Sequence, residues 1–163
     1  MNIFFLSNDY TTAAEMHCDK HAVKMVLETA QMLSTAHRAL DGNTYADKHS
    51  LCKIAHLNHP STQWVRAGSE NYKWAYGLFV ALLNEHKKRY GTTHKYWSLV
   101  KPLKQLPKSI PTNSFKRPPQ CMPDVYKHNN AVTAYRQYYR GEKAYFASWA
   151  RASKTPKWWQ IAA

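Results

Sequence analysis

The longest uninterrupted helical pattern in the chain covers residues 13–40, which contain neither glycine nor proline. Thr11-Thr12 followed by Glu15 forms a capping-box pattern at its start, and Asp41-Gly42 follows its end. These signals predict one long helix. Because most of its positions are apolar, we expect the rest of the chain to pack around it.

One face of this predicted helix carries a narrow polar stripe. At 100° per residue, an arc of about 100° holds His17, Lys20, His21, Lys24, Glu28, Gln31 and Thr35. Such a stripe suits the wall of a cleft. A strip that merely faces solvent, supported by the Lys24–Glu28 pair at i, i+4, would give the same pattern.

Two further helical patterns complete the predicted fold, at residues 61–91 and 129–152. Between them, residues 95–123 contain six of the eight prolines, interspersed with basic residues, so regular structure there must be brief. The apolar run at residues 3–6 is too short for a helix and brings the N-terminus close to the core. We predict an all-α, compact single domain over residues 1–163, with three main helices and a long proline-rich basic connection.

Cysteine usage and hydropathy favour a cytoplasmic protein. Three cysteines without a CxxC pair argue against a disulfide framework. The apolar runs are too short to cross a bilayer, and the N-terminus lacks a basic leader. We therefore expect no membrane contact, and a monomer is favoured.

Charge and aromatic content point to a polyanionic partner, DNA or a nucleotide. The formal charge is +13, from 23 Lys+Arg against 10 Asp+Glu, and the chain has six Trp and eleven Tyr. Clustered cations neutralise phosphates and flat rings stack on unpaired bases, although a basic surface can also serve solubility and rings can fill a core. The candidate nucleic-acid contacts are Arg66, Lys88, Arg89, Lys116, Arg117, Arg136, Arg140, Trp158 and Trp159.

The stripe also suggests chemistry. Glu28 is its only carboxylate, and such a group can stabilise the cationic sugar formed when a glycosidic bond breaks. A nucleophilic amine would come from Lys24, beside other cations that favour its neutral form, or from the α-amino group of Met1. The residues predicted to orient substrate are His17, Lys20, His21, Gln31, His59 and Trp64.

Metal chemistry is a weaker interpretation. His17 and His21 at i, i+4 can bind one ion, but Lys20 and Lys24 beside them would repel a cation. No HExxH, GxxxxGK[ST], GxGxxG or GxSxG motif occurs. We therefore predict neither a metal nor another cofactor.

Several of these features together resemble the small, all-helical pyrimidine-dimer DNA glycosylase family of the phage endonuclease V type. The features are the apolar N-terminus, Cys18-x-Lys20-His21 with Glu28 on the first helix, His59-Pro60 before Trp64, the run from Glu85 to Gly91, and the Pro156-Lys157-Trp158-Trp159 tail. The chain is also similar to a phage-encoded group of unassigned function that carries the pattern DKH-xx-KM-x-LE-x-AQML.

The glycosylase resemblance implies two catalytic groups, an N-terminal α-amine exposed after Met removal and a first-helix glutamate that maps to Glu28. One departure concerns Asn2, whose size predicts that Met1 is retained, so the amine would sit on Met1. A second departure is that Lys20, Lys24 and Arg38, with histidines between them, replace the arginine-rich surface that the resemblance implies.

The sequence thus predicts a DNA-acting N-glycosylase on a damaged or modified pyrimidine, with lyase activity at abasic sites as a possible second step. The alternative from another class is a non-catalytic phage factor that binds nucleic acid or a nucleotide. A metal-dependent nucleotide hydrolase is the third hypothesis.

Overall fold

The computed structural model describes residues 1–159, and this part of the chain is all-α, with seven α-helices and no strand. The helices are α1 (Tyr10–Met16), α2 (Asp19–Asp41), α3 (Asn43–Lys48), α4 (Pro60–Arg66), α5 (Ser69–Tyr90), α6 (Val100–Leu103) and α7 (Ala131–Glu142). Short 3₁₀ turns cover Lys95–Leu99, Asp124–Tyr126 and Lys157–Trp159. The all-α prediction is confirmed, but the prediction of three main helices undercounts them. None of the helices in residues 1–159 is long and apolar enough to cross a membrane.

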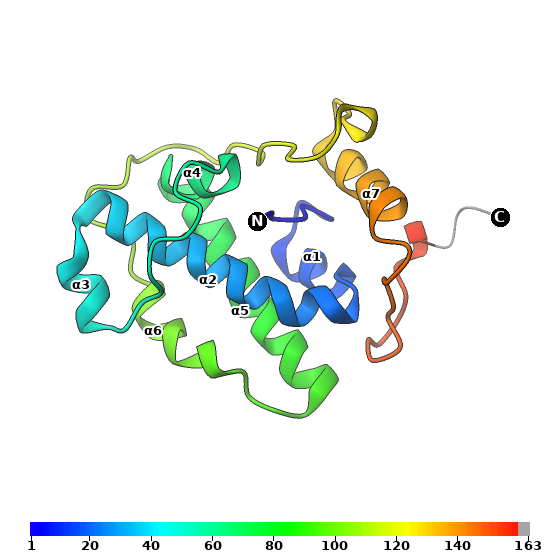
Figure 1. The fold of residues 1–163 in the computed structure, drawn as a ribbon, viewed down its shortest axis with the longest axis horizontal. Coiled ribbons are helices and arrows are strands. Elements are labelled where there is room, and N and C mark those ends of the chain that lie inside the picture. The colour runs from blue at the N-terminus through cyan, green and yellow to red at the C-terminus, as the bar shows by residue number, and fades with distance from the viewer. Residues whose placement is uncertain (160–163) are drawn as a thin grey trace.

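Helices α2 and α5 form the centre of the molecule, where they pack on each other with α1 and α4 alongside (Figure 1). Met25, Met32 and Leu33 of α2 are buried, as are Leu78 and Leu82 of α5. The N-terminal segment enters this core as an extended piece between α4 and α7 (Figure 1). Its position agrees with the prediction that residues 3–6 bring the N-terminus close to the core.

The predicted helix at residues 13–40 is interrupted at His17-Cys18, where both residues have extended backbone. The cause is tertiary. Cys18 N–H donates to the Tyr139 hydroxyl, Asp19 N–H donates to the Ser148 carbonyl, and the His17 carbonyl accepts from Arg89. Distant segments thus satisfy backbone groups that a continuous helix would pair internally.

The predicted helix at residues 61–91 is also two helices, because Gly68 is extended between α4 and α5. Ser69 N–H donates to the Pro111 carbonyl, and Asn71 Nδ2 donates to the Trp64 carbonyl, so the corner is held by the proline-rich connection and by α5 itself. The third predicted helix ends ten residues early, since α7 stops at Glu142 and turns follow it.

Candidate functional site

Glu28 lies close to Met1 and Lys24, the two other residues that the sequence predicted to be catalytic. The Met1 α-amino nitrogen lies 3.8 Å from Glu28 Oε2, and Lys24 Nζ lies 3.4 Å from Oε1. Asn2 N–H donates to Oε2 at 3.0 Å, so each carboxylate oxygen faces one amine. The Glu28 side chain is 11% exposed and that of Lys24 62%, which places the pair at the edge of the surface.

Besides the bond to Glu28, contacts with two distant segments hold the N-terminus at this position. Asn2 Nδ2 donates to the Cys121 carbonyl at 3.0 Å, and the Asn2 side-chain oxygen accepts Ile3 N–H at 2.8 Å. The Thr62 hydroxyl lies 3.6 Å from Met1 Sδ. Residues 3–6, which follow Asn2, are buried in the core. This burial and the contacts of Met1 and Asn2 together fix the position of the amine.

His59 lies at the start of α4, next to the amine and Glu28. Its Nδ1 accepts Ser61 N–H at 3.2 Å, so the neutral ring carries its proton on Nε2. Burial, with smaller contributions from the α-amino cation and His56, lowers the pKa of His59, and Glu28 opposes this shift. His59 is therefore a predicted substrate residue outside α2 that lies near the charged pair.

The two histidines of the predicted stripe do not occupy equivalent positions. His17 lies in the break between α1 and α2 and is fully buried, with Nδ1–H donating to the Ala13 carbonyl at 2.7 Å and Nε2 without a partner. Burial lowers the pKa of His17 to about 4. His21 stacks on Phe4, with ring centroids 4.5 Å apart, and its Nδ1 lies 2.5 Å from the Tyr139 hydroxyl. Burial, with repulsion from His17 and nearby lysines, lowers its pKa to about 3, so both rings are neutral at pH 7.

The other predicted substrate residues lie at different depths. Lys20 is exposed on α2, and Gln31 is half-buried one turn beyond Glu28. Trp64 is buried, and its Nε1–H donates to the Lys116 carbonyl at 2.8 Å. Of these three, Lys20 and Gln31 share the α2 surface with Glu28.

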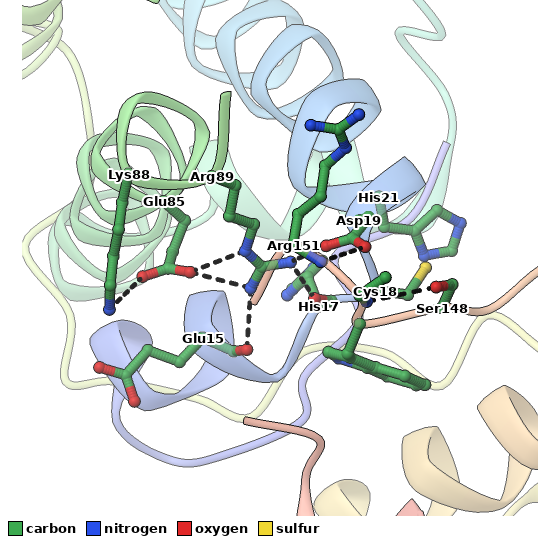
Figure 2. Close-up of polar contacts among 12 residues, drawn as sticks. Glu15, His17, Cys18, Asp19, His21, Glu85, Lys88, Arg89, Ser148 and Arg151 are labelled. Atoms are coloured by element: carbon green, nitrogen blue, oxygen red, sulfur yellow. Dashed lines mark hydrogen bonds and ion pairs between the residues drawn. The ribbon is translucent and has the colours of Figure 1, made fainter. Parts of the chain in front are cut away.

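Arg89, predicted to contact phosphate, lies at the centre of a buried polar network (Figure 2). Its guanidinium bonds to Glu85 at 2.9 Å and to Asp19 at 3.2 Å, and it donates to the backbone carbonyls of Glu15 and His17. Asp19 also accepts Arg151 N–H, which ties the segment after α7 to the same cluster. This guanidinium joins α1, α2 and α5, and it does not face solvent.

The remaining predicted phosphate contacts fall into two groups. Lys88, Lys116 and Arg117 are exposed, although Lys88 Nζ lies 3.7 Å from Glu85. Arg66, Arg136 and Arg140 are half-buried and donate to the carbonyls of Leu57, Leu6 and Trp158 respectively. Trp158 is buried and half-buried Trp159 packs on Trp149, so this tail lies against the body of the protein.

Metal-ligand geometry is not present in residues 1–159, where no group of three or more His, Cys, Asp or Glu side chains is placed to hold an ion. The His17–His21 pair considered from the sequence has ring centroids 6.4 Å apart, and the free nitrogen of His17 is enclosed.

Comparison with known proteins gives no further guide, because no protein-family model, no curated protein and no solved structure matches the chain. The site therefore has to be interpreted from its own geometry.

Several residues around Asn2 and His21 were not nominated from the sequence. Asn2 and Cys121 position the N-terminus, while Phe4, Tyr138 and Lys143 surround His21. The apolar run at residues 3–6 is the sequence feature that could have identified Phe4. No local pattern marks Cys121 or Lys143, which reach the site only through the fold.

Proposed function

We propose that this protein is a DNA-acting N-glycosylase on a damaged or modified pyrimidine. The observation that supports the proposal is the α-amino group of Met1, 3.8 Å from the Glu28 carboxylate in a strongly basic protein. An amine held beside a single carboxylate has the parts needed for attack on a sugar carbon.

In the proposed reaction the amine nitrogen bonds to C1′ as the C1′–N bond to the base breaks. The base leaves with the bonding electron pair and takes up a proton. Glu28 offsets the positive charge that develops on the sugar and accepts a proton from the attacking amine. Opening of the sugar ring gives an imine between Met1 and C1′, from which water releases the amine. Loss of the C2′ proton from that imine would break the C3′–O bond, which is the lyase step.

Met1 is a better nucleophile here than Lys24. The bond from Asn2 N–H to Glu28 fixes the adjoining α-amino group beside the carboxylate, whereas Lys24 Nζ lies at the end of a long side chain. The Lys24 side chain is also 62% exposed and free to approach a phosphate. We assign Lys24 to substrate binding and to orienting Glu28.

Borohydride trapping on UV-irradiated and untreated duplex DNA tests the proposal, with intact mass first establishing a free amine on Met1. Wild type should give a damage-dependent covalent adduct at Met1. Glu28→Gln should bind DNA but lose the adduct by at least a hundredfold, whereas Lys24→Gln should keep it. A Gly-Ser dipeptide added before Met1 should abolish trapping, while the same dipeptide added at the C-terminus should not.

The alternative, a non-catalytic nucleic-acid or nucleotide binder, draws support from the same carboxylate. Both Glu28 oxygens already pair with amines, an arrangement that would also serve simply to anchor the N-terminus. Binding of DNA without product or adduct on any modified substrate would favour this alternative. An adduct located on Lys24 would overturn the assignment of Met1.

A further inference from the structure

A cluster of aromatic rings is made by the N-terminal segment, α2, α7 and the turn after α7, about 10 Å along α2 from Glu28. The ring of Phe4 stacks on His21 at 4.5 Å and on Tyr138 at 6.2 Å, and Phe146 packs edge-on against His21 at 5.2 Å. Phe4 and His21 are buried, whereas Tyr138 and Phe146 keep part of their surface exposed. The cluster therefore consists of two buried rings, Phe4 and His21, and two partly exposed rings, Tyr138 and Phe146.

Each accessible ring carries a lysine ammonium. Lys20 Nζ lies 5.0 Å from the centre of the Phe146 ring, and Lys143 Nζ lies 4.7 Å from that of Tyr138. Within residues 1–159 neither lysine forms an ion pair with a carboxylate. Both charges thus remain available to an anion that approaches the rings.

The cluster adjoins the proposed catalytic pair. His21, Lys24 and Glu28 follow one another along one face of α2, and seven residues of helix span about 10 Å. Phe4 is three residues from Met1, and its positive φ of 51° turns its ring toward His21 and α7. Non-glycine residues in this conformation are held by their surroundings, and such positions cluster at functional sites.

We propose that Tyr138 and Phe146, with Lys20 and Lys143, form a subsite that stacks one unpaired nucleobase and neutralises its phosphate, about 10 Å along α2 from Glu28. The ligand class is a single nucleotide unit of a DNA strand that has left the base stack. Rings supply sequence-tolerant stacking and the lysines supply the phosphate contact, which is the combination used for unpaired strands. This inference rests on the proposed function, because it identifies the part of that site that would hold the substrate strand.

Binding without chemistry tests the subsite separately from catalysis. The probe is a short single-stranded oligonucleotide with one 2-aminopurine, whose fluorescence falls when the base stacks on an aromatic ring. Wild type and Glu28→Gln should both quench it. Tyr138→Leu/Phe146→Leu should bind about 5-fold to 100-fold more weakly and lose the quench. Tyr138→Phe, which keeps the ring, should behave as wild type.

Trp97 with Lys87 provides a matched control, because it is another exposed ring with an ammonium 6.0 Å from its centre, located on the 3₁₀ turn Lys95–Leu99. Trp97→Leu should leave affinity and quenching unchanged. Lys20→Gln/Lys143→Gln, which leaves the rings in place, should reduce the salt dependence of binding by about one phosphate contact. If Tyr138→Leu/Phe146→Leu does not fold, the lysine variant still tests the subsite.

Two results would overturn the subsite. One is equal affinity and quenching for Trp97→Leu and the folded Tyr138→Leu/Phe146→Leu protein. The other is an unchanged salt dependence in Lys20→Gln/Lys143→Gln. If these tests fail but wild type still forms a borohydride adduct, the glycosylase proposal is supported and the subsite is rejected. If the oligonucleotide is quenched as expected but no adduct forms, the subsite is supported and the glycosylase proposal is rejected.

Discussion

At the scale of single residues, Arg89 illustrates how a charged side chain serves the fold. Its fully buried guanidinium pairs with Glu85 and Asp19 and donates to two backbone carbonyls (Figure 2). Arg89→Met would leave two carboxylates without their buried partner, and we expect a loss of about 3–5 kcal/mol in unfolding free energy, measured by urea denaturation. The neighbouring Lys88→Gln should change it by less than about 0.5 kcal/mol. A loss below 1 kcal/mol for Arg89→Met would contradict this account.

The buried histidines predict how stability depends on pH. Their folded pKa values, about 4 for His17 and about 3 for His21, lie below the ordinary value of 6.5. As the pH falls, the unfolded chain therefore takes up protons first. Stability is full above about pH 6.5 and is lost progressively toward pH 4. We expect the urea midpoint to fall between pH 7 and pH 5.

A variant comparison separates this effect from the titration of carboxylates. His17→Gln removes one buried imidazole and should flatten the dependence between pH 7 and pH 5. His128→Gln, which changes an exposed histidine, should leave the slope as it is in wild type. Equal slopes in the two variants would show that His17 does not carry the effect.

At the scale of helices, Gly77 allows α5 to approach α1. A Cβ built at Gly77 would lie 2.7 Å from the Tyr10 ring. Gly77→Ala should therefore lower the unfolding free energy by up to about 2 kcal/mol, because overpacking outweighs a gain of about 1 kcal/mol in helix propensity. In a Tyr10→Ala background the same substitution should be stabilising. Denaturation of the four proteins of this cycle gives the coupling, and equal effects in both backgrounds would argue against it.

Helix interiors and helix boundaries differ in how far the sequence predicts them. The periodicity of residues 19–41 identifies α2, its polar face and the Lys24–Glu28 pair, because these depend on spacing alone. The breaks at His17-Cys18 and at Gly68 depend on partners 42 or more residues away along the chain, Tyr139 in the first case and Pro111 in the second. Likewise, the run at residues 3–6 indicated a buried N-terminus, but nothing local predicted that Asn2 would reach Cys121.

At the scale of the whole molecule, the charge of +13 predicts strongly salt-dependent binding to DNA. Not all 23 basic residues can contribute, because Arg38 and Arg89 are buried in internal ion pairs. With 6–10 phosphate contacts, affinity should fall by about 10³–10⁵ between 50 and 200 mM salt, as measured by fluorescence anisotropy.

Substitutions of exposed cations and of internal cations should have different effects on this salt dependence. Lys116→Gln/Arg117→Gln should lower the slope of log affinity against log salt by about two, since both side chains project from the proline-rich connection into solvent. Arg66→Gln, at a half-buried residue whose guanidinium bonds to the Leu57 carbonyl, should change the slope by less than one. A threefold or smaller change in wild-type affinity over the same salt range would rule out a phosphate-dominated interface.

The buried N-terminus has a consequence for the order of events during synthesis. Asn2 is made early in synthesis, but the two residues that hold it, Glu28 and Cys121, lie 26 and 119 residues further along the chain. The N-terminal segment therefore takes its final position only after Cys121 has been made, so this part of the core closes late in synthesis.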